Sequence, residues 1–141
     1  MISDNLKLTG NLTIAVNNEI VQETKNLVVT AGKNFVASRM KDTTKAAMTH
    51  MAVGTGTTAA AAANTTLVSE TDRNALTSTT VTNNEIAYVC TWAAGDATAA
   101  LTEAGIFNAS SGGDMLCRTV FSVVNKGASD SMTITWTVTV S

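Results

Sequence analysis

The sequence has one histidine and two cysteines, His50, Cys90 and Cys117, which could form a catalytic Cys-His pair or bind zinc. A catalytic cysteine needs a histidine beside it and a third group that orients the ring. His50 lies in an alternating stretch typical of a strand, and the cysteines lack the C-x-x-C spacing of zinc or redox sites. We expect a strand histidine with a local hydrogen bond and two free, buried thiols, with a disulfide as the open alternative. The sequence predicts no catalytic residue, no metal site and no cofactor.

Two short motifs are similar to functional sites without meeting their requirements. The stretch SETDR brings Glu70, Asp72 and Arg73 together, which favours a solvated or ion-paired turn over an acid/base pair. The stretch GTGTTA at 54–59 follows an expected strand, as phosphate-binding loops do. It lacks the lysine of a P-loop and the third glycine of a dinucleotide fingerprint, so nucleotide binding is not predicted.

The aromatic residues Tyr88, Trp92 and Trp136 offer another chemistry, a stacking platform for carbohydrate. Such a platform would make the protein a lectin-like binding module. All three residues lie at the apolar positions of alternating stretches, however, so they are predicted to be core residues. The lectin alternative requires at least one tryptophan on the surface.

The composition argues against several classes of partner. Charged residues make up 14% of the 141 residues, below the roughly 25% typical of soluble domains, and Thr, Ser, Asn and Ala take their place. The net charge of −2 gives no basic field, so no direct contact with nucleic acid is expected. The N-terminus lacks the pattern of a signal peptide, and no run of about 18 apolar residues suits a membrane helix. We therefore expect a soluble protein without a membrane partner.

The segment 132–141, MTITWTVTVS, alternates between apolar residues and threonine. In a strand this pattern gives one apolar face and one hydroxyl face. Threonine packs well on a pleated sheet and is neutral, so a threonine face costs less to desolvate than a lysine face. The pattern favours contact of that face with another protein, and simple exposure to solvent is the alternative. The threonines are Thr133, Thr135, Thr137 and Thr139.

Alternation and turn signals recur at spacings of about ten residues and predict seven or eight strands. The elements expected are hairpins around Asn17–Asn18 and Asn83–Asn84, strands at 48–56, 104–109, 115–124 and 132–141, and a helix at 31–41 that Thr30 caps. The Ala-rich stretch at 57–66 is too short for a stable helix and is expected to be an ordered loop. Together these elements predict a single all-β domain, 1–141. Its fold would be a two-sheet antiparallel sandwich, jelly-roll-like, with one short helix near residues 31–41.

The inward positions of these elements define the expected core. In the strand at 115–124, the inward set is Met115, Cys117, Thr119, Phe121 and Val123. Over the whole chain the predicted core residues are Leu12, Ile14, Val36, Ile86, Tyr88, Trp92, Phe107, Phe121, Ile134, Trp136 and Val138.

Four segments occur in a characteristic order: NLVVTAGKNFVASRM, MTHMAVGTGTTAAAAANTTLVSETDR, EAGIFNASSGGDMLCRTVF and the closing MTITWTVTVS. Together they resemble a family of short structural proteins of tailed bacteriophages. That family shares a small helix, a strand that leads into G-T-G, an Ala-rich stretch with T-x-L-x-x-E-x-x-R-like spacing, E-A-G-[IL]-F-N, and a Thr-rich W-T-[VI]-x-V terminus. The resemblance covers most of residues 26–141, and Leu67, Glu70 and Arg73 stand at the expected offsets.

The resemblance implies a virion component without enzymatic activity. Such modules are found on capsids and in tail, baseplate or fibre proteins, where they are usually fused to shaft or receptor-binding segments. A chain of this length favours a capsid cement or decoration protein, made in the cytoplasm of the bacterial host and bound to the capsid exterior. Its partner would be the major capsid protein. A tail, baseplate or fibre adaptor of the virion is the alternative.

Self-association is also expected. A sandwich without prolines leaves sheet edges that can pair, and twofold symmetry is the commonest closed arrangement, so we predict a homodimer, with a trimer as the second choice. The candidate contact residues are two loops and the threonine face. They are Gly54, Thr55, Gly56, Thr57, Thr58, Ser110, Ser111, Gly112, Gly113, Asp114, Thr133, Thr135, Thr137 and Thr139.

Overall fold

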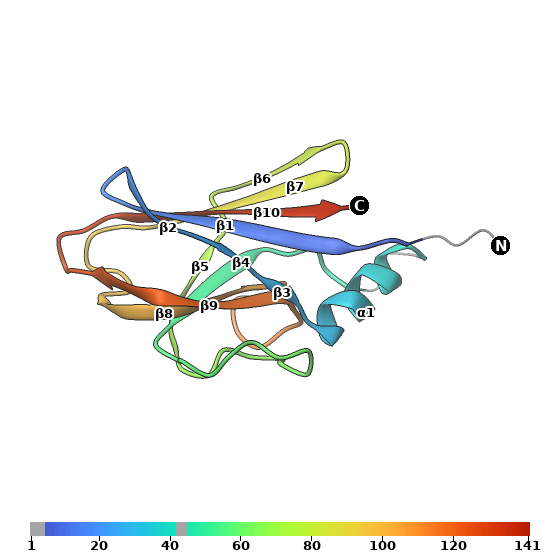
Figure 1. Ribbon diagram of the computed structural model, residues 1–141, viewed down its shortest axis with the longest axis horizontal. Coiled ribbons are helices and arrows are strands. Elements are labelled where there is room, and N and C mark those ends of the chain that lie inside the picture. Colours follow the sequence, from blue (N-terminus) through green and yellow to red (C-terminus); the bar gives the residue numbers. More distant parts are fainter. Residues whose placement is uncertain (1–4, 42–44) are drawn as a thin grey trace.

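The computed structural model describes residues 5–41 and 45–141, which form ten strands and one helix. The strands make two five-stranded sheets that pack face to face (Figure 1). In chain order the elements are β1 (Leu8–Val16), β2 (Glu19–Lys25), β3 (Leu27–Val28), α1 (Thr30–Arg39), β4 (His50–Gly54), β5 (Glu70–Ala75), β6 (Ser78–Thr82), β7 (Glu85–Trp92), β8 (Ala99–Phe107), β9 (Met115–Lys126) and β10 (Met132–Val140).

We call the two layers sheet A and sheet B. Sheet A has the strand order β2-β1-β10-β7-β6, and sheet B has the order β3-β9-β8-β4-β5. All neighbouring strands in both sheets are antiparallel. The predicted all-β, two-sheet antiparallel sandwich with one short helix is therefore confirmed, with ten strands instead of seven or eight.

The two asparagine turns join neighbouring strands of sheet A, as predicted. Asn17 and Asn18, with φ angles of 52° and 66°, connect β1 to β2. Asn83, with a φ angle of 53°, begins the turn between β6 and β7. Asparagine tolerates this left-handed conformation better than most residues, and turns of this kind match the twist of the strands that they join.

The main core fills the space between the sheets. Nine of the eleven predicted core residues are buried, and Val36 and Ile86 are half-buried at the margin of the core. Phe107 is buried in a second cluster, on the opposite face of sheet B. The Trp136 indole N–H donates a hydrogen bond to Asn26 Oδ1 at 2.7 Å, so the polar atom of this large side chain is satisfied.

The alternation predicted for β9 is wrong at two positions, because its pairing with β8 is irregular. The register shifts between Leu101 and Glu103, and beyond that point Val124 is buried while Val123 is 53% exposed. A second shift, at the start of β9, places Met115 in the second cluster instead of the main core. A bulge changes which face later side chains occupy, so strict alternation fails there.

Helix α1 lies close to its predicted place but begins differently. The helix covers Thr30–Arg39, and Val29 occupies the N-cap position without a side-chain hydrogen bond, so the predicted cap by Thr30 is wrong. Gly32 packs against the backbone of Leu116 in β9, and a Cβ there would collide with the Leu116 carbonyl oxygen. The glycine that weakens the first turn is thus required by this close contact.

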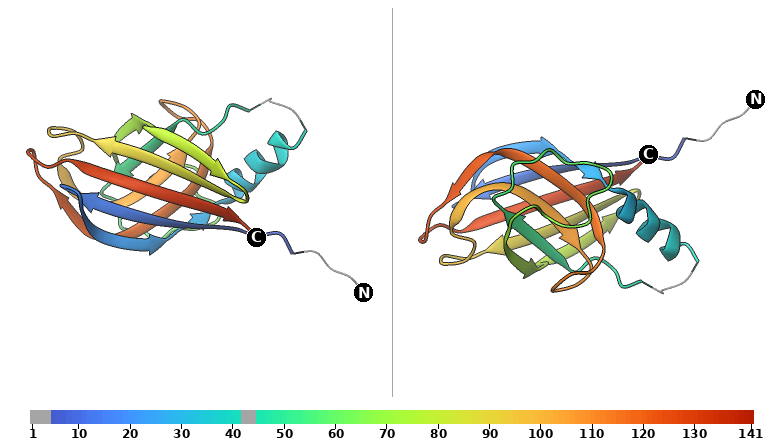
Figure 2. Two further views of the ribbon diagram at one scale, coloured as in Figure 1. Left: turned by 90° about the horizontal axis from the view of Figure 1, so that it is seen from above. Right: turned by 90° about the horizontal axis from the view of Figure 1, so that it is seen from below.

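The two sheets differ in what covers their outer faces. The loop 55–69 runs across the outer face of sheet B, where Leu67 packs with Phe107 and Met115 in the second cluster (Figure 2, right). No described segment crosses the outer face of sheet A in the opposite view (Figure 2, left). Sheet B is therefore covered on both faces, and sheet A only on the face that it turns to the core.

Candidate protein-contact surface

The outer face of sheet A is an open surface whose side chains are fixed by the strand register. Directly opposed residues of an antiparallel pair share a face, and β10 lies between β1 and β7 at the centre of the sheet. The residues on this face are Lys25, Glu23 and Ile20 of β2; Thr9, Asn11, Thr13 and Ala15 of β1; Thr133, Thr135, Thr137 and Thr139 of β10; Glu85, Ala87, Val89 and Thr91 of β7; and Ser78, Thr80 and Thr82 of β6.

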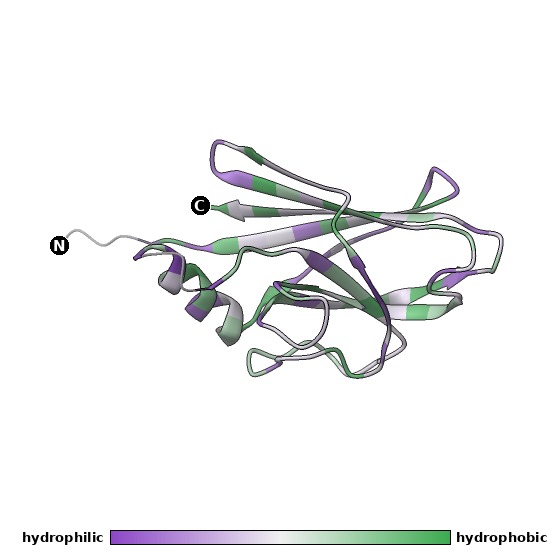
Figure 3. Ribbon diagram, turned by 180° about the vertical axis from the view of Figure 1, so that it is seen from behind, coloured by the Kyte–Doolittle hydropathy of each residue, from purple (hydrophilic) through white to green (hydrophobic). Residues whose placement is uncertain are grey.

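Charge on this surface is confined to its margins. Glu23 and Lys25 lie on the edge strand β2, and Glu85 lies at the first position of β7. The centre offers hydroxyl, amide and methyl groups, and β10 shows pale and green bands without deep purple (Figure 3). A partner that covers this centre desolvates no charged side chain of the sheet, which keeps the cost of contact low.

The four threonines of β10 are brought together as predicted. Thr135 is exposed, and the other three are half-buried between neighbouring strands. The hydroxyl oxygens of Thr91 and Thr133 lie 3.1 Å apart, and the Thr139 hydroxyl donates to Glu85 Oε1 at 3.5 Å. A hydroxyl can donate one hydrogen bond and accept two, so this row retains unused capacity for a partner.

The predicted contact segment 54–58 lies where β4 leads into the loop over sheet B. Thr55, Thr57 and Thr58 are exposed, but Gly54 and Gly56 are buried. A Cβ on either glycine would press on a carboxylate oxygen of Glu103. The two glycines therefore allow the chain to approach this carboxylate and offer no exposed surface, which removes them from the candidate contact residues.

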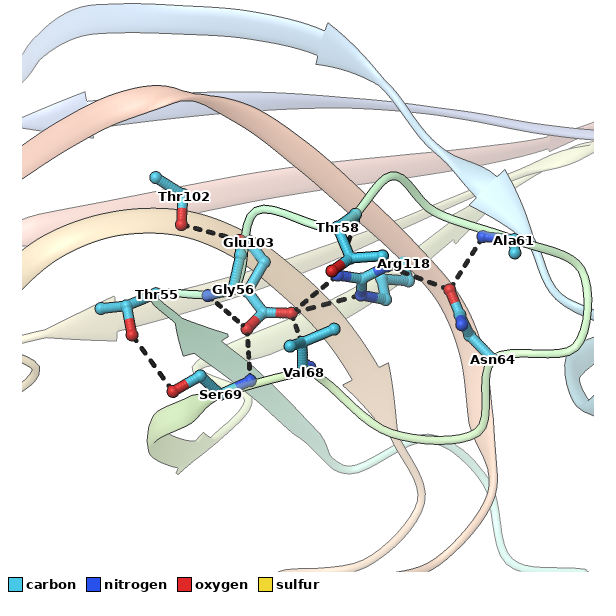
Figure 4. A network of polar contacts seen from close by, with 10 residues as sticks. All are labelled: Thr55, Gly56, Thr58, Ala61, Asn64, Val68, Ser69, Thr102, Glu103 and Arg118. Atoms are coloured by element: carbon cyan, nitrogen blue, oxygen red, sulfur yellow. Dashed lines mark hydrogen bonds and ion pairs between the residues drawn. The ribbon is translucent and has the colours of Figure 1, made fainter.

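Glu103 is the polar centre beneath this loop (Figure 4). Its carboxylate accepts hydrogen bonds from the backbone N–H groups of Gly56, Val68 and Ser69 at 2.7, 2.9 and 2.8 Å. Oε1 also accepts from Nε and Nη2 of Arg118 at 3.2 and 3.0 Å. Both side chains are fully buried, so each compensates the charge of the other. One carboxylate thus ties the beginning of the loop to its end.

Arg118 extends the same network to the middle of the loop. Nη1 donates to Asn64 Oδ1 at 3.0 Å, and Nη2 donates to the Thr58 carbonyl at 2.9 Å. Asn64 Oδ1 also accepts the Ala61 N–H at 2.8 Å. The Ala-rich stretch is therefore an ordered loop, as predicted, and the buried ion pair beneath it holds its shape.

The network also sets the pKa of Glu103. Burial would raise the pKa of this carboxyl above its usual value of 4.5, but the N–H groups of Val68, Ser69 and Gly56 and the Arg118 guanidinium together lower it by more. The pKa of Glu103 therefore lies below its usual value, and the side chain is charged at neutral pH. A carboxyl whose pKa falls on folding stabilises the folded state above its unfolded pKa and loses that contribution as the pH falls.

A second arginine, Arg73, supports the other predicted contact loop. Arg73 Nη1 donates to the carbonyls of Ala109 and Gly112 at 3.0 and 2.8 Å, and its guanidinium lies 3.8 Å from the centre of the Phe107 ring. The predicted ion pair of Arg73 with Glu70 is present at 2.7 Å, but in strand β5 instead of a turn. Residues 110–113 are exposed on the turn that Arg73 holds.

The histidine and the two cysteines have structural surroundings: His50 makes a local hydrogen bond, and both cysteines are buried. His50 Nδ1 lies 2.7 Å from Thr49 Oγ1, which is the predicted local hydrogen bond. Cys90 and Cys117 are free and buried, so the predicted thiols are confirmed over the disulfide. Burial raises the pKa of Cys90 to about 12 and the pKa of Cys117 well above its usual value, so both stay protonated at neutral pH.

Two features of other functional classes are absent from the described parts of the chain, 5–41 and 45–141. There, no group of three or more His, Cys, Asp or Glu side chains is placed to hold a metal ion. Of the helices in those parts, none has the length and apolar character needed to cross a membrane.

The lectin-like alternative is contradicted by burial. Trp92 and Trp136 have no exposed surface, and Tyr88 is 5% exposed. A stacking platform needs an open aromatic face, and none of these three rings has one. The aromatic residues of β7 and β10 are core residues, as their alternation predicts.

Glu103 and Arg118 organise the loop over sheet B, but neither is among the candidate residues predicted from the sequence. A signal was present in the sequence, because Glu103 directly precedes the expected strand 104–109 and Arg118 lies within the expected strand 115–124, each between small or apolar neighbours. Their pairing depends on the register of β8 against β9, in which Arg118 lies opposite Gly105. That register was not available from the sequence.

Comparisons of the chain with protein-family models, curated proteins and solved structures found no match.

Proposed function

We propose that the protein is a non-enzymatic structural component of a bacteriophage virion. Specifically, we propose a capsid cement or decoration protein that binds the outer surface of the shell formed by the major capsid protein. The observation that carries this proposal is the open, threonine-rich outer face of sheet A, which has no charge at its centre. The sequence segments that resemble phage structural proteins support the same class.

The outer face of sheet B is covered by the chain itself, and the outer face of sheet A is not, which supports a docking role for sheet A. Sheet B carries its own cover, loop 55–69, fixed by the buried pair of Glu103 and Arg118. On sheet A the hydroxyl and methyl groups of the central strands stand where a freely exposed sheet usually carries lysine and glutamate. A sheet face of this kind fits a flat protein surface and can exchange its hydrogen bonds with water for hydrogen bonds with a partner.

The mechanism proposed is stabilisation by mass action. A protein that binds the assembled shell and not its separated subunits lowers the free energy of the shell. Many identical copies multiply this effect, because each copy holds neighbouring capsid subunits together. This role requires a rigid body and a complementary surface, and no chemical step.

Replacing Thr135 and Thr137 together by lysine is expected to weaken binding to capsids at least about tenfold. The two threonines lie at the centre of the outer face, so the lysines would be desolvated against the partner without an opposite charge. Both side chains point away from the core, so the fold is expected to persist. Binding would be measured by co-sedimentation with particles that lack the protein.

The matched control carries lysine at Thr65 and Thr66, two exposed threonines of the loop over sheet B that are not among the candidate contact residues. This control is expected to bind as the wild type does. If the Thr135→Lys/Thr137→Lys protein decorates capsids as well as wild type at equal concentration, the outer face of sheet A is merely exposed. If only the control loses binding, the contact surface lies on the opposite layer.

A further inference from the structure

Three of the four sheet edges are protected against pairing with another strand. β3 has only two residues. β2 and β5 each carry three charged residues, and each has a register shift against its neighbour. Short length, charge and bulges are the features by which natural sheets avoid joining edge to edge.

The remaining edge, β6, has none of these features. Its sequence, STTVT, carries no charge, and all five residues are exposed. Its register with β7 is continuous from Ser78 to Thr82. Val81 is 69% exposed and borders a shallow hollow of about 140 Å³, which Ile86, Val138 and Val140 also line. A regular, uncharged edge presents unpaired backbone N–H and C=O groups to a further strand.

We propose that β6 pairs antiparallel with β6 of a second copy of the chain, so that two copies of sheet A join into one ten-stranded sheet. The partner proposed is a second copy because a twofold interface brings the same segment of both copies together. STTVT has no charged residue, so two copies of β6 do not repel each other. With the axis at Thr80, each Thr80 faces its equivalent, Ser78 faces Thr82, and Thr79 faces Val81. Each of these three pairings joins residues that are β-branched or carry a hydroxyl, and cross-strand pairs of such residues stabilise neighbouring strands.

The symmetry also fixes how the two outer faces are related. A twofold axis that exchanges two antiparallel strands of one sheet is perpendicular to that sheet. The rotation therefore keeps the faces on their own sides, and both threonine faces point the same way. The use of this arrangement rests on the proposed function, because two copies would then offer a capsid shell one continuous threonine-rich surface, in which Glu85 of each copy is the charged residue near the seam. The pairing of β6 does not rest on the proposed function.

The contact is short, which sets its expected strength. The five residues of β6 span about 17 Å of sheet edge. The surface that so short a contact buries is smaller than the area buried in a standard stable interface. The dimer is therefore weak and concentration-dependent in solution. A shell that holds two copies side by side raises the effective concentration of the β6 edges, so that the pairing of β6 with β6 forms more readily there than in solution.

Disulfide trapping tests the pairing in solution, without capsids. Thr80→Cys is expected to form a disulfide-linked dimer on mild oxidation, because residues directly opposite in a sheet have Cβ atoms about 4.5–5.5 Å apart. The native thiols, Cys90 and Cys117, are buried and do not compete. Thr135→Cys is the matched control, since it is an exposed threonine of β10, two strands away from the edge, and is expected to stay monomeric. The proposal is overturned if cysteines at Thr79, Thr80 and Val81 all cross-link no faster than Thr135→Cys.

Sedimentation velocity over a concentration series gives the second readout. Thr80→Lys places like charges opposite each other and is expected to raise the dimer Kd at least about tenfold, whereas Thr135→Lys leaves Kd unchanged. A Kd that is the same for wild type and Thr80→Lys, or a trimer mass at high concentration, contradicts the pairing. The double lysine variant at Thr135 and Thr137 reports on shell binding separately, so failure of one proposal is distinguishable from failure of the other.

Discussion

Glu103→Gln is expected to lower the free energy of unfolding by about 3–5 kcal/mol. The substitution leaves Arg118 fully buried with an uncompensated charge. It also replaces the carboxylate that accepts three backbone N–H groups of loop 55–69 with an amide, which has one oxygen and adds two donors. The loop should therefore loosen as the whole protein becomes less stable. Urea titration gives the stability, and hydrogen exchange at Gly56, Val68 and Ser69 reports on the loop.

The matched control is Glu70→Gln, which breaks the other carboxylate–arginine pair of sheet B. The Glu70 side chain is 35% exposed, so solvent screens its charge and the loss is expected to stay within about 1 kcal/mol. Equal losses for the two variants would show that burial of the Glu103 pair has no special weight. A loop that exchanges no faster in Glu103→Gln than in wild type would contradict its role as the anchor of the loop.

The pH dependence of the unfolding free energy shows whether the Glu103–Arg118 pair stabilises the protein through its charge or through its packing. Because folding lowers the pKa of Glu103, its contribution is complete above the usual value of 4.5 and is lost as the pH falls through the folded pKa. The stability difference between wild type and Glu103→Gln should therefore shrink at acidic pH. A difference that stays constant with pH would assign the effect of the substitution to packing instead of charge.

Trp136→Ala is expected to cost about 3–5 kcal/mol of unfolding free energy. Trp136 is fully buried at the centre of sheet A, and its indole N–H is bonded to Asn26 Oδ1 at 2.7 Å. Truncation opens a large cavity and leaves the Asn26 acceptor without this donor. Denaturant titration would measure the loss, with Val123→Ala as the control, since that exposed side chain should cost no more than about 0.5 kcal/mol.

A loss below about 1 kcal/mol for Trp136→Ala would contradict a core position for this residue. Trp136 would then lie near the surface, and a carbohydrate-binding role for the aromatic residues of sheet A would have to be considered again. A loss in the expected range supports the assignment of one apolar face and one hydroxyl face to β10.

The elements with strict alternation were predictable from the sequence because one buried face fixes their register. β10 is the plainest case, with Ile134, Trp136 and Val138 in the core and the threonines outside. The asparagine turns were predictable for a related reason, since few residues accept a left-handed backbone. The two-sheet sandwich follows from the number and spacing of such elements.

The rest depended on contacts between distant segments. Val123 was misplaced because a bulge in β9 reverses the alternation, and nothing in the local sequence marks the bulge. The pairing of Glu103 with Arg118 required the β8–β9 register and the path of loop 55–69. The open face of sheet A could be suspected from the threonines, but only the fold identifies β6 as the unprotected edge beside it.

The number of copies in purified phage particles tests the central proposal most directly. Quantitative mass spectrometry of intact particles would give the ratio of this protein to the major capsid protein. A cement protein that covers the shell is expected in numbers comparable with the major capsid protein. A handful of copies per particle, in the multiples of three or six of a tail or baseplate ring, would contradict a cement role and identify the protein as an adaptor.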